Sequence, residues 1–220
     1  MIKHISFDFW NTLYIGNPKF KQSRAEFLSS RYDLDVSTIL SKISSVKNFC
    51  DKTSEHTLTA IGSELQYLHL LMSIGVQSKC IRPELNIITR IANALFIEHP
   101  PIPIIDWSEL EKLKDKYSIS ISCNTGFISG QLIDRMLTIT GVENYFDFTL
   151  FSDLIGHSKP SPLFGEQILI ESGVEYFNEI LHIGDNINTD GKMCNYTLIN
   201  YFQNPKDSID LFQISNIVNE

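Results

Sequence analysis

Three carboxylates stand where apolar, strand-like segments of the sequence end. Asp8 follows the run "HISF", Asp185 closes "EILHIGD", and Asp190 follows a short way on. Carboxylates that are brought together repel one another unless a cation joins them. Mg²⁺ prefers hard oxygen ligands and keeps room for waters and a substrate phosphate. If these segments meet, they form a Mg²⁺ site, and a carboxylate that also faces a substrate can act as a nucleophile.

Two further segments contain polar or basic residues that could contribute to such a site. Asn124-Thr125-Gly126 follows the strand-like "SISISC", and Lys159-Pro160 lies in a loop between a strand-like and a helix-like segment. A lysine and Mg²⁺ together can neutralise the charge on a phosphoryl group that is being transferred. We therefore expect these two segments to reach the same rim as the carboxylates.

Strand-like and helix-like segments alternate through most of the chain. Alternation of this kind predicts βαβ units and a parallel sheet covered on both faces, which is a Rossmann-like α/β fold. Ligands of such sheets bind outside the carboxyl ends of the strands, where the polar segments lie. The predicted strands are residues 2–9, 118–124, 146–152, 179–185 and 197–202, and the predicted helices are residues 106–117, 128–141, 161–173 and a short start near 188–194.

The segment between the first strand and the rest has a different character. From about residue 19 to residue 95 the apolar residues recur at spacings of three and four, which is the helical period. The prolines of "HPPIPI", residues 99–104, end this run because proline cannot continue a helix. We therefore predict a core domain of residues 1–15 and 104–220, interrupted by an all-helical domain of residues 16–103.

The composition excludes several classes of partner. The chain has 220 residues, 43% of them hydrophobic, with a formal net charge of -8. It shows no basic stripe, which argues against nucleic acid and anionic membrane surfaces. We find no apolar run that could span a bilayer and no leader-like pattern. Scattered cysteines without a CxxC pair argue against zinc and disulfides and favour a cytoplasmic location; they are Cys50, Cys80, Cys123 and Cys194.

Four segments resemble, in order, the four motifs of the haloacid dehalogenase-like (HAD) superfamily. They are "DFWNTL", "SISCNTG", "GHSKPSP" and "HIGDNINTD". The helical segment lies between the first and second motifs, where members with a C1-type helical cap carry that cap. The resemblance covers the Rossmann-like core, whereas the cap agrees only in position and helical character.

The resemblance implies a role for each matched residue. Asp8 would be the nucleophile that forms an aspartyl-phosphate, and Lys159 would balance charge beside it. Asp8, Asp185, Asp190 and the backbone carbonyl of Trp10 would hold Mg²⁺. Asn124 would assist catalysis, and the expected substrate-binding residues are Trp10, Cys123, Thr125 and Gly126.

Two positions depart from the family pattern. Trp10 replaces the aspartate that phosphatases of this superfamily usually carry two residues after the nucleophile, and tryptophan cannot transfer the proton of a leaving group. Cys123 replaces a hydroxyl residue, and a thiol is a weak donor. We expect a Mg²⁺-dependent phosphatase of a small phosphorylated metabolite, slow on alkyl phosphates, and a monomer or homodimer. The alternatives are a binding or regulatory module with little catalysis and a dehalogenase-like or phosphonatase-like enzyme.

Overall fold

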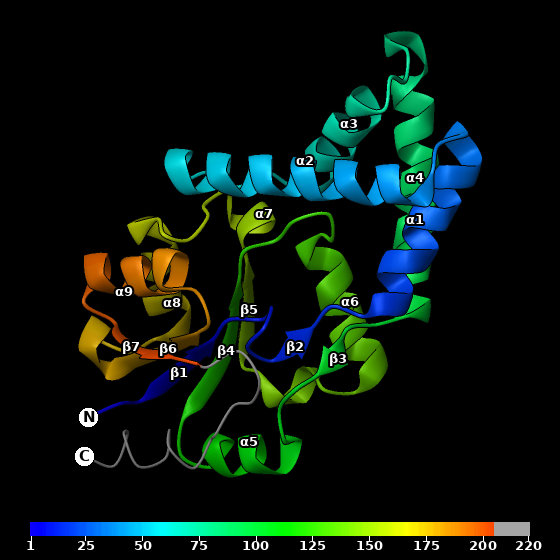
Figure 1. Cartoon of the computed structure of the whole chain (residues 1–220). Coiled ribbons are helices and arrows are strands. Elements are labelled where there is room, and N and C mark those ends of the chain that lie inside the picture. Colours follow the sequence, from blue (N-terminus) through cyan, green and yellow to red (C-terminus); the bar gives the residue numbers. More distant parts are fainter. Residues whose placement is uncertain (205–220) are drawn as a thin grey trace.

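The centre of the molecule is a sheet of five parallel strands. The structure is a computed structural model that describes residues 1–204. The strands lie in the order β5-β4-β1-β6-β7 (Figure 1). Every neighbouring pair in this sheet is parallel, so all carboxyl ends meet at one edge. The strands are β1 (His4–Phe7), β4 (Ser118–Cys123), β5 (Phe148–Phe151), β6 (Ile180–Gly184) and β7 (Asn200–Gln203).

Helices cover both faces of the sheet, as the alternating pattern predicts (Figure 1). On one face α5 (Trp107–Lys114) and α6 (Gly130–Thr140) bury apolar residues against β1, β4 and β6. On the other, α8 (Pro162–Ser172) and α9 (Lys192–Thr197) form a separate apolar core. The shorter elements are α7 (Ser152–Ile155), η1 (Glu143–Tyr145), η2 (Phe177–Glu179) and η3 (Ile187–Gly191), of which η3 is a π-turn.

Between β1 and β4 the chain forms a group of four helices, which we call the helical insert. Its members are α1 (Pro18–Tyr32), α2 (Val36–Thr57), α3 (Ser63–Ser73) and α4 (Ser78–Glu98). They share an apolar core of their own, to which the sheet-bearing part of the chain contributes Phe127. In Figure 1 α2 lies across the carboxyl-end side of the sheet, and α1 and α4 lie to one side of it. The insert therefore stands over the edge at which the polar segments gather.

The predicted helix ends agree with the observed caps in the core. Asp106 accepts a hydrogen bond from the Ser108 backbone N–H at the start of α5. Gly141 and Gly173 adopt positive φ at the ends of α6 and α8, a conformation that glycine reaches without strain. These predictions are confirmed, since cap residues carry their signal within a few positions of the chain.

Several boundaries differ from the sequence prediction. The helical pattern of residues 19–95 is interrupted before α3, which begins at Ser63, because the backbone of Ala60 bonds to Gly156 of the core. Residue 197 ends α9 and residue 198 caps that helix at positive φ, so neither belongs to a strand; the Thr197 hydroxyl bonds back to the Met193 carbonyl. The two-stranded antiparallel sheet of β2 (Tyr14–Ile15) and β3 (Ile102–Pro103) was not predicted. It lies beside the proposed domain boundaries.

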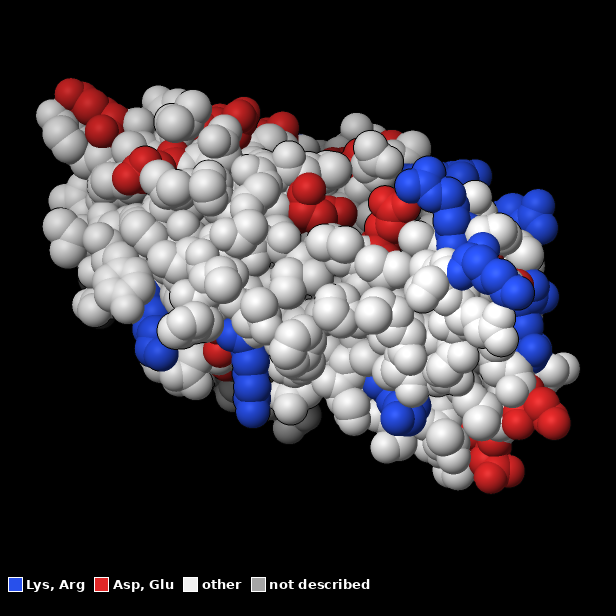
Figure 2. All heavy atoms as spheres, turned by 90° about the horizontal axis from the view of Figure 1, so that it is seen from above, with Lys and Arg blue, Asp and Glu red and all other residues white. Residues whose placement is uncertain are grey.

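The face of the molecule seen in Figure 2 carries both basic and acidic side chains. On the face seen in Figure 2 the largest group of Lys and Arg side chains lies at one end, the end at which α1 and α4 lie in Figure 1. Acidic side chains are scattered along the same face. Within residues 1–204, none of the helices combines the length and the apolar character that a membrane crossing requires.

Candidate active site

The register of the sheet places Asp8 at the centre of the carboxyl-end edge. Phe7 is the last paired residue of β1, level with Ile121 of β4 and Ile183 of β6. Asp8 follows it, and its backbone N–H donates to the Ile183 carbonyl over 2.8 Å. The side chain is therefore fixed between the ends of the two neighbouring strands. Asp8 is also largely buried, which is uncommon for a carboxylate without partners.

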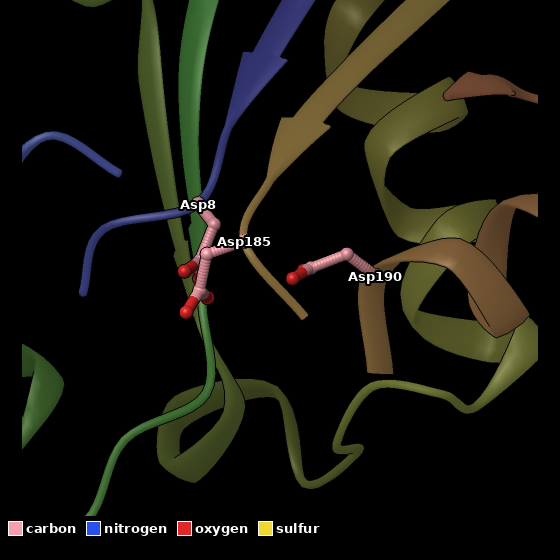
Figure 3. Close-up of side chains that lie close together, drawn as sticks. All are labelled: Asp8, Asp185 and Asp190. Atoms are coloured by element: carbon pink, nitrogen blue, oxygen red, sulfur yellow. The ribbon is translucent and has the colours of Figure 1, made fainter. Parts of the chain in front are cut away.

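The other two carboxylates come from the end of β6 and from the turn that follows it. Asp185, Asp190 and Asp8 each offer an oxygen within 4.8 Å of the others (Figure 3). The close-up shows Asp8 and Asp185 at adjacent strand ends and Asp190 directed at them from the following turn. Asn11, at positive φ in the loop after β1, donates to Asp185 Oδ2 over 3.3 Å. The structure thus brings the three predicted carboxylates together.

Lys159 connects two of these carboxylates. Its Nζ donates to Asp8 Oδ1 over 2.8 Å, to Asp190 Oδ1 over 2.6 Å and to the Ser122 carbonyl over 2.6 Å. Its side chain is 1% exposed. An ammonium has three donors, and each of them is used here. Lys159 is therefore held in one position against the carboxylate of Asp8.

His182 supports Asp190 from inside the sheet. Its Nε2 lies 3.0 Å from Asp190 Oδ1, and its Nδ1 lies 3.0 Å from the hydroxyl of Ser6. The Ser6 hydroxyl in turn donates to Ser122 Oγ over 2.8 Å. The Asn186 backbone N–H donates to the other Asp190 oxygen over 3.2 Å. Asp190 is consequently fixed through both of its oxygens.

Burial and charge act differently on the two carboxylates that share Lys159. Burial raises the pKa of Asp8 to about 7, and the Lys159 ammonium only partly offsets it. Burial also acts to raise the pKa of Asp190, but Lys159 and His182 outweigh it and hold that pKa well below its ordinary value. Burial acts to lower the pKa of Lys159, but Asp190 and Asp8 raise it above its usual range. Lys159 and Asp190 are therefore an ion pair, and Asp8 is the carboxylate with incomplete charge compensation.

The donor set and its charge fit Mg²⁺. Three carboxylates face one ammonium, so the ionised cluster has an excess of two negative charges (3 − 1 = 2). A divalent cation balances that excess, and carboxylate oxygens are its preferred ligands. The hydrogen bonds to Asp190 and Asp185 do not exclude coordination, since a carboxylate has about four acceptor positions. Asp8, Asp185 and Asp190 are thus the residues that would hold the ion. A further ligand at the Trp10 carbonyl stays a prediction.

Asn124 joins the second and third motifs. Its Nδ2 donates to the Lys159 carbonyl over 2.8 Å, and its Oδ1 accepts from the Lys159 backbone N–H over 2.8 Å. The amide therefore positions the segment that carries the lysine. Thr125 is held by Ser152, whose hydroxyl accepts from the Thr125 backbone N–H over 2.9 Å. The contribution of Asn124 to this site is to position Lys159.

The remaining predicted residues lie around this centre with different accessibility. Trp10 is partly exposed and stands edge-on to Phe9, with ring centroids 4.8 Å apart. Gly126 lies against Gln66 of the insert. Cys123 is fully buried, its Sγ donates to the Asn124 carbonyl, and burial raises the pKa of its thiol well above the usual range. The Cys123 side chain packs in the core, and its predicted contact with a substrate stays a prediction.

The sequence did not single out several residues that support the site. His182 lies within a predicted strand, where the sequence pattern does not distinguish it from a packed residue, and only the structure reveals its contact with Asp190. Asn11 and Asn186 reach the acidic residues through contacts that have no sequence signal of their own. The signal that the sequence does contain is the position of Asn11 and Asn186, each within a few residues of Asp8 or Asp185.

Comparison with known proteins agrees with this geometry. A family model described as haloacid dehalogenase-like hydrolase matches residues 2–196. Among solved structures, the putative HAD-hydrolase YfnB from Bacillus subtilis bound to magnesium has a TM-score of 0.71 at 14% identity, covering 100% of this chain and 99% of that one. A HAD phosphatase from Thermococcus onnurineus has a TM-score of 0.70 at 16% identity, covering 99% and 98%.

A third similar structure is the 2-haloacid dehalogenase from Pseudomonas syringae pv. Tomato DC3000. Its TM-score is 0.68 at 18% identity, covering 100% of this chain and 99% of that one. No curated protein matches the chain. At these identities the solved structures show a shared fold, and they include enzymes that act on different bonds.

Proposed function

The chain belongs to the haloacid dehalogenase-like hydrolase family, and from that premise we propose that this hydrolase is a Mg²⁺-dependent phosphatase. Its substrate would be a small phosphorylated metabolite, and Asp8 would be the nucleophile. The observation that carries the proposal is the contact of Lys159 Nζ with Asp8 Oδ1 over 2.8 Å, beside carboxylate oxygens that lie within 4.8 Å of one another. This arrangement combines a nucleophile, a fixed cation and the ligands of a metal ion.

The chemistry follows from the positions of these side chains. An Asp8 oxygen attacks phosphorus, the bond from phosphorus to the ester oxygen breaks, and the leaving alkoxide takes a proton from water. Water then hydrolyses the aspartyl-phosphate, which releases phosphate and restores Asp8. Lys159 holds Oδ1 and offsets the negative charge that gathers on the phosphoryl oxygens. Mg²⁺ bound by the carboxylates would supply Lewis-acid polarisation of the phosphoryl group.

The helical insert would act as a cap over this site. The backbone of its segment between α2 and α3 bonds to the loop before Lys159: Ala60 N–H to the Gly156 carbonyl over 3.3 Å, and Ser158 N–H to the Leu58 carbonyl over 3.1 Å. These two bonds support a position of the insert beside the reacting groups. There it would exclude water and select the substrate.

A panel of phosphate esters, assayed with and without Mg²⁺, tests the proposal. The wild-type chain should release phosphate only with the metal, and Asp8→Asn should lower kcat by about 10³-fold or more, because it removes the nucleophile. Asp115→Asn, at an exposed position at the end of α5, makes the same change of charge and should leave kcat unchanged. Turnover that survives in Asp8→Asn would contradict the assignment.

Trp10 supports a second candidate, a binding or regulatory module with little turnover. Tryptophan offers no proton near neutral pH, and general acid–base catalysis contributes roughly 10²- to 10⁴-fold. The absence of turnover on every ester, including acyl phosphates, whose leaving groups need little protonation, would favour this candidate. A dehalogenase or phosphonatase would be identified in the same panel, by halide release from a 2-haloacid or phosphate release from a phosphonate.

A further inference from the structure

Arg24 of α1 is a buried cation between the insert and the core. It is 8% exposed. Its guanidinium carbon lies 4.9 Å from the ring centroid of Phe20, on the same helix, and 5.1 Å from that of Phe127, in the core loop after β4. The two rings therefore hold the guanidinium where the insert meets the loop that also contains Asn124.

No carboxylate among the described residues forms an ion pair with the Arg24 guanidinium. Its Nε has no hydrogen-bond partner, and one Nη makes a long contact of 3.4 Å with the Tyr67 hydroxyl. Arg31, in the last turn of the same helix, instead contacts the Glu84 carboxylate through two of its nitrogens, at 2.5 and 2.7 Å. The same helix thus contains one arginine with a complete acidic partner and one with none.

A second polar group at this position also lacks a partner. Gln66 of α3 is 1% exposed, and its Nε2 donates to the Ile61 carbonyl over 2.9 Å. Its Oε1 has no hydrogen-bond partner within the described part of the chain and faces Gly126, where an added Cβ would lie 3.6 Å from it. The next residue of that helix, Tyr67, stands edge-on to Phe127 with centroids 4.9 Å apart. Donors and an acceptor therefore converge on the turn at residues 126–127.

This turn is directly connected to the catalytic groups. Gly126 and Phe127 lie two and three residues after Asn124, whose amide positions the Lys159 backbone. A buried guanidinium without an anion is costly, and aromatic rings offset only part of that cost. Buried polar groups without partners in a native protein call for a specific explanation, such as a bound ligand. Arg24 lies against the loop that leads from Asn124, next to the proposed phosphoryl-transfer site in the sequence of contacts, and the ligand that fits a guanidinium is an anion.

We propose that Arg24 binds a second anionic group of the substrate, a carboxylate or a second phosphate, while the phosphoryl group lies at Asp8. The planar fork of arginine matches the oxygens of either group. Gln66 Oε1 would accept from a hydroxyl on the carbon chain between the two anionic groups. The inference rests on the proposed function and narrows its substrate to phosphorylated acids or bisphosphates.

Binding of non-hydrolysable phosphonates, measured calorimetrically in Mg²⁺, tests the inference without relying on turnover. The probes are propylphosphonate, 3-phosphonopropionate and propane-1,3-bisphosphonate, which differ at the far end of the chain. The wild-type chain should bind at least one doubly anionic probe about 10-fold or more tighter than propylphosphonate. Arg24→Met should remove that preference and retain the affinity for propylphosphonate, which also shows that the variant is folded. The control is Arg90→Met, which makes the same change of charge at an exposed position of α4 and should keep the preference.

Each outcome has one interpretation. Loss of preference for the carboxylate probe alone identifies the second group as a carboxylate, and loss for the bisphosphonate alone identifies it as a phosphate. A preference that persists in Arg24→Met, or that is equally lost in Arg90→Met, overturns the role of Arg24. A wild-type chain that binds propylphosphonate as tightly as the doubly anionic probes overturns the inference but leaves the phosphatase proposal standing. Failure to bind any phosphonate overturns both.

Discussion

At the scale of single residues, we expect Trp10 to limit turnover. It lies two residues after the proposed nucleophile Asp8, where the proposed reaction needs a proton donor for the leaving group, and indole offers no transferable proton near neutral pH. Lys159 does not replace it, because its three donors are engaged by Asp8, Asp190 and the Ser122 carbonyl. Leaving groups that depart without a proton should therefore react fastest.

Trp10→Asp should raise kcat on an alkyl phosphate, by up to about 10²- to 10⁴-fold, because it places a general acid beside the ester oxygen. The rate on an acyl phosphate should change little. Initial rates of phosphate release on both substrates give the comparison. Trp10→Asn is the control, because the asparagine side chain is nearly the same size as aspartate but cannot act as an acid. Equal rates in the two variants would show that proton transfer does not limit the wild-type enzyme.

The sequence predicted the centre of the site better than its surroundings. Asp8, Asp185, Asp190 and Lys159 come from short motifs at strand ends, and parallel strands must bring such ends to one edge. Arg24 could not be singled out, because its helix contains a second arginine, Arg31, and only the tertiary contacts show which of the two lacks an acidic partner.

At the scale of elements, polar side chains connect the central strands inside the sheet. His4 of β1 contacts the hydroxyls of Ser118 and Ser120 on β4, at 2.5 and 2.9 Å, and stacks on Phe148. Burial lowers the pKa of His4 to about 4, with Asp147 acting to raise it and His182 to lower it. The imidazole is therefore neutral in the folded protein at pH 5, whereas it is largely protonated in the unfolded chain.

This difference predicts that acid destabilises the fold. Between the folded pKa of about 4 and the unfolded value near 6.5 the unfolded state binds more protons, so the free energy of unfolding falls as pH falls. From pH 7 to pH 5 His4 should account for a loss of about 2 kcal/mol. His182, whose pKa burial also lowers, acts in the same direction. Urea unfolding of wild type and His4→Gln at pH 7 and pH 5 measures how much of the loss of unfolding free energy is due to His4. If both proteins lose the same free energy of unfolding, the prediction is wrong.

At Gly130, the first residue of α6, the packing leaves no room for a side chain. A Cβ at Gly130 would lie 2.3 Å from the Phe151 Cβ and 2.9 Å from Asp153 Oδ1. Phe151 is 1% exposed and cannot move aside without disturbing the core. Gly130→Ala should therefore destabilise the protein by about 1–3 kcal/mol or more in urea unfolding.

The control for this prediction is Gly16→Ala, because nothing lies within 4 Å of a Cβ at that position. Its effect should stay within about 0.5 kcal/mol. Similar stabilities of the two variants would show that α6 shifts easily against β5, which the close packing does not predict.

Periodicity predicted most helices and strands, and the failures have a common cause. Strand β2 has two residues and pairs with Ile102–Pro103 far along the chain, so it depends on a long-range contact rather than on a local pattern. The start of α3 is likewise set by the bond between Ala60 and Gly156. Local sequence cannot contain either signal, because the pairing partner in each case lies 80 or more residues away.

At the scale of the whole molecule, the insert and the core meet at two places that involve the site. Phe127 of the core packs among the apolar residues of the insert, and residues 58–60 of the insert bond to residues 156–158 of the core. One contact lies next to the Asn124 loop and the other next to Lys159. Any movement of the insert would therefore be transmitted to the groups around Asp8, which suits a cap that closes on its substrate.

Mg²⁺ should stabilise the whole chain, because the folded state alone brings the three carboxylates together. At a concentration of 100 times its Kd the ion should add about 2.7 kcal/mol, which for a chain of this length raises Tm by roughly 5–10 °C. Asp185→Asn should abolish most of this rise. Without metal the variant should be as stable as wild type or more stable, since the substitution removes one repelling charge. Calorimetric melting with and without Mg²⁺ measures both effects.

An equal rise of Tm in the two proteins would place the ion elsewhere. A variant that is less stable than wild type without metal would show that Asp185 has a structural role of its own.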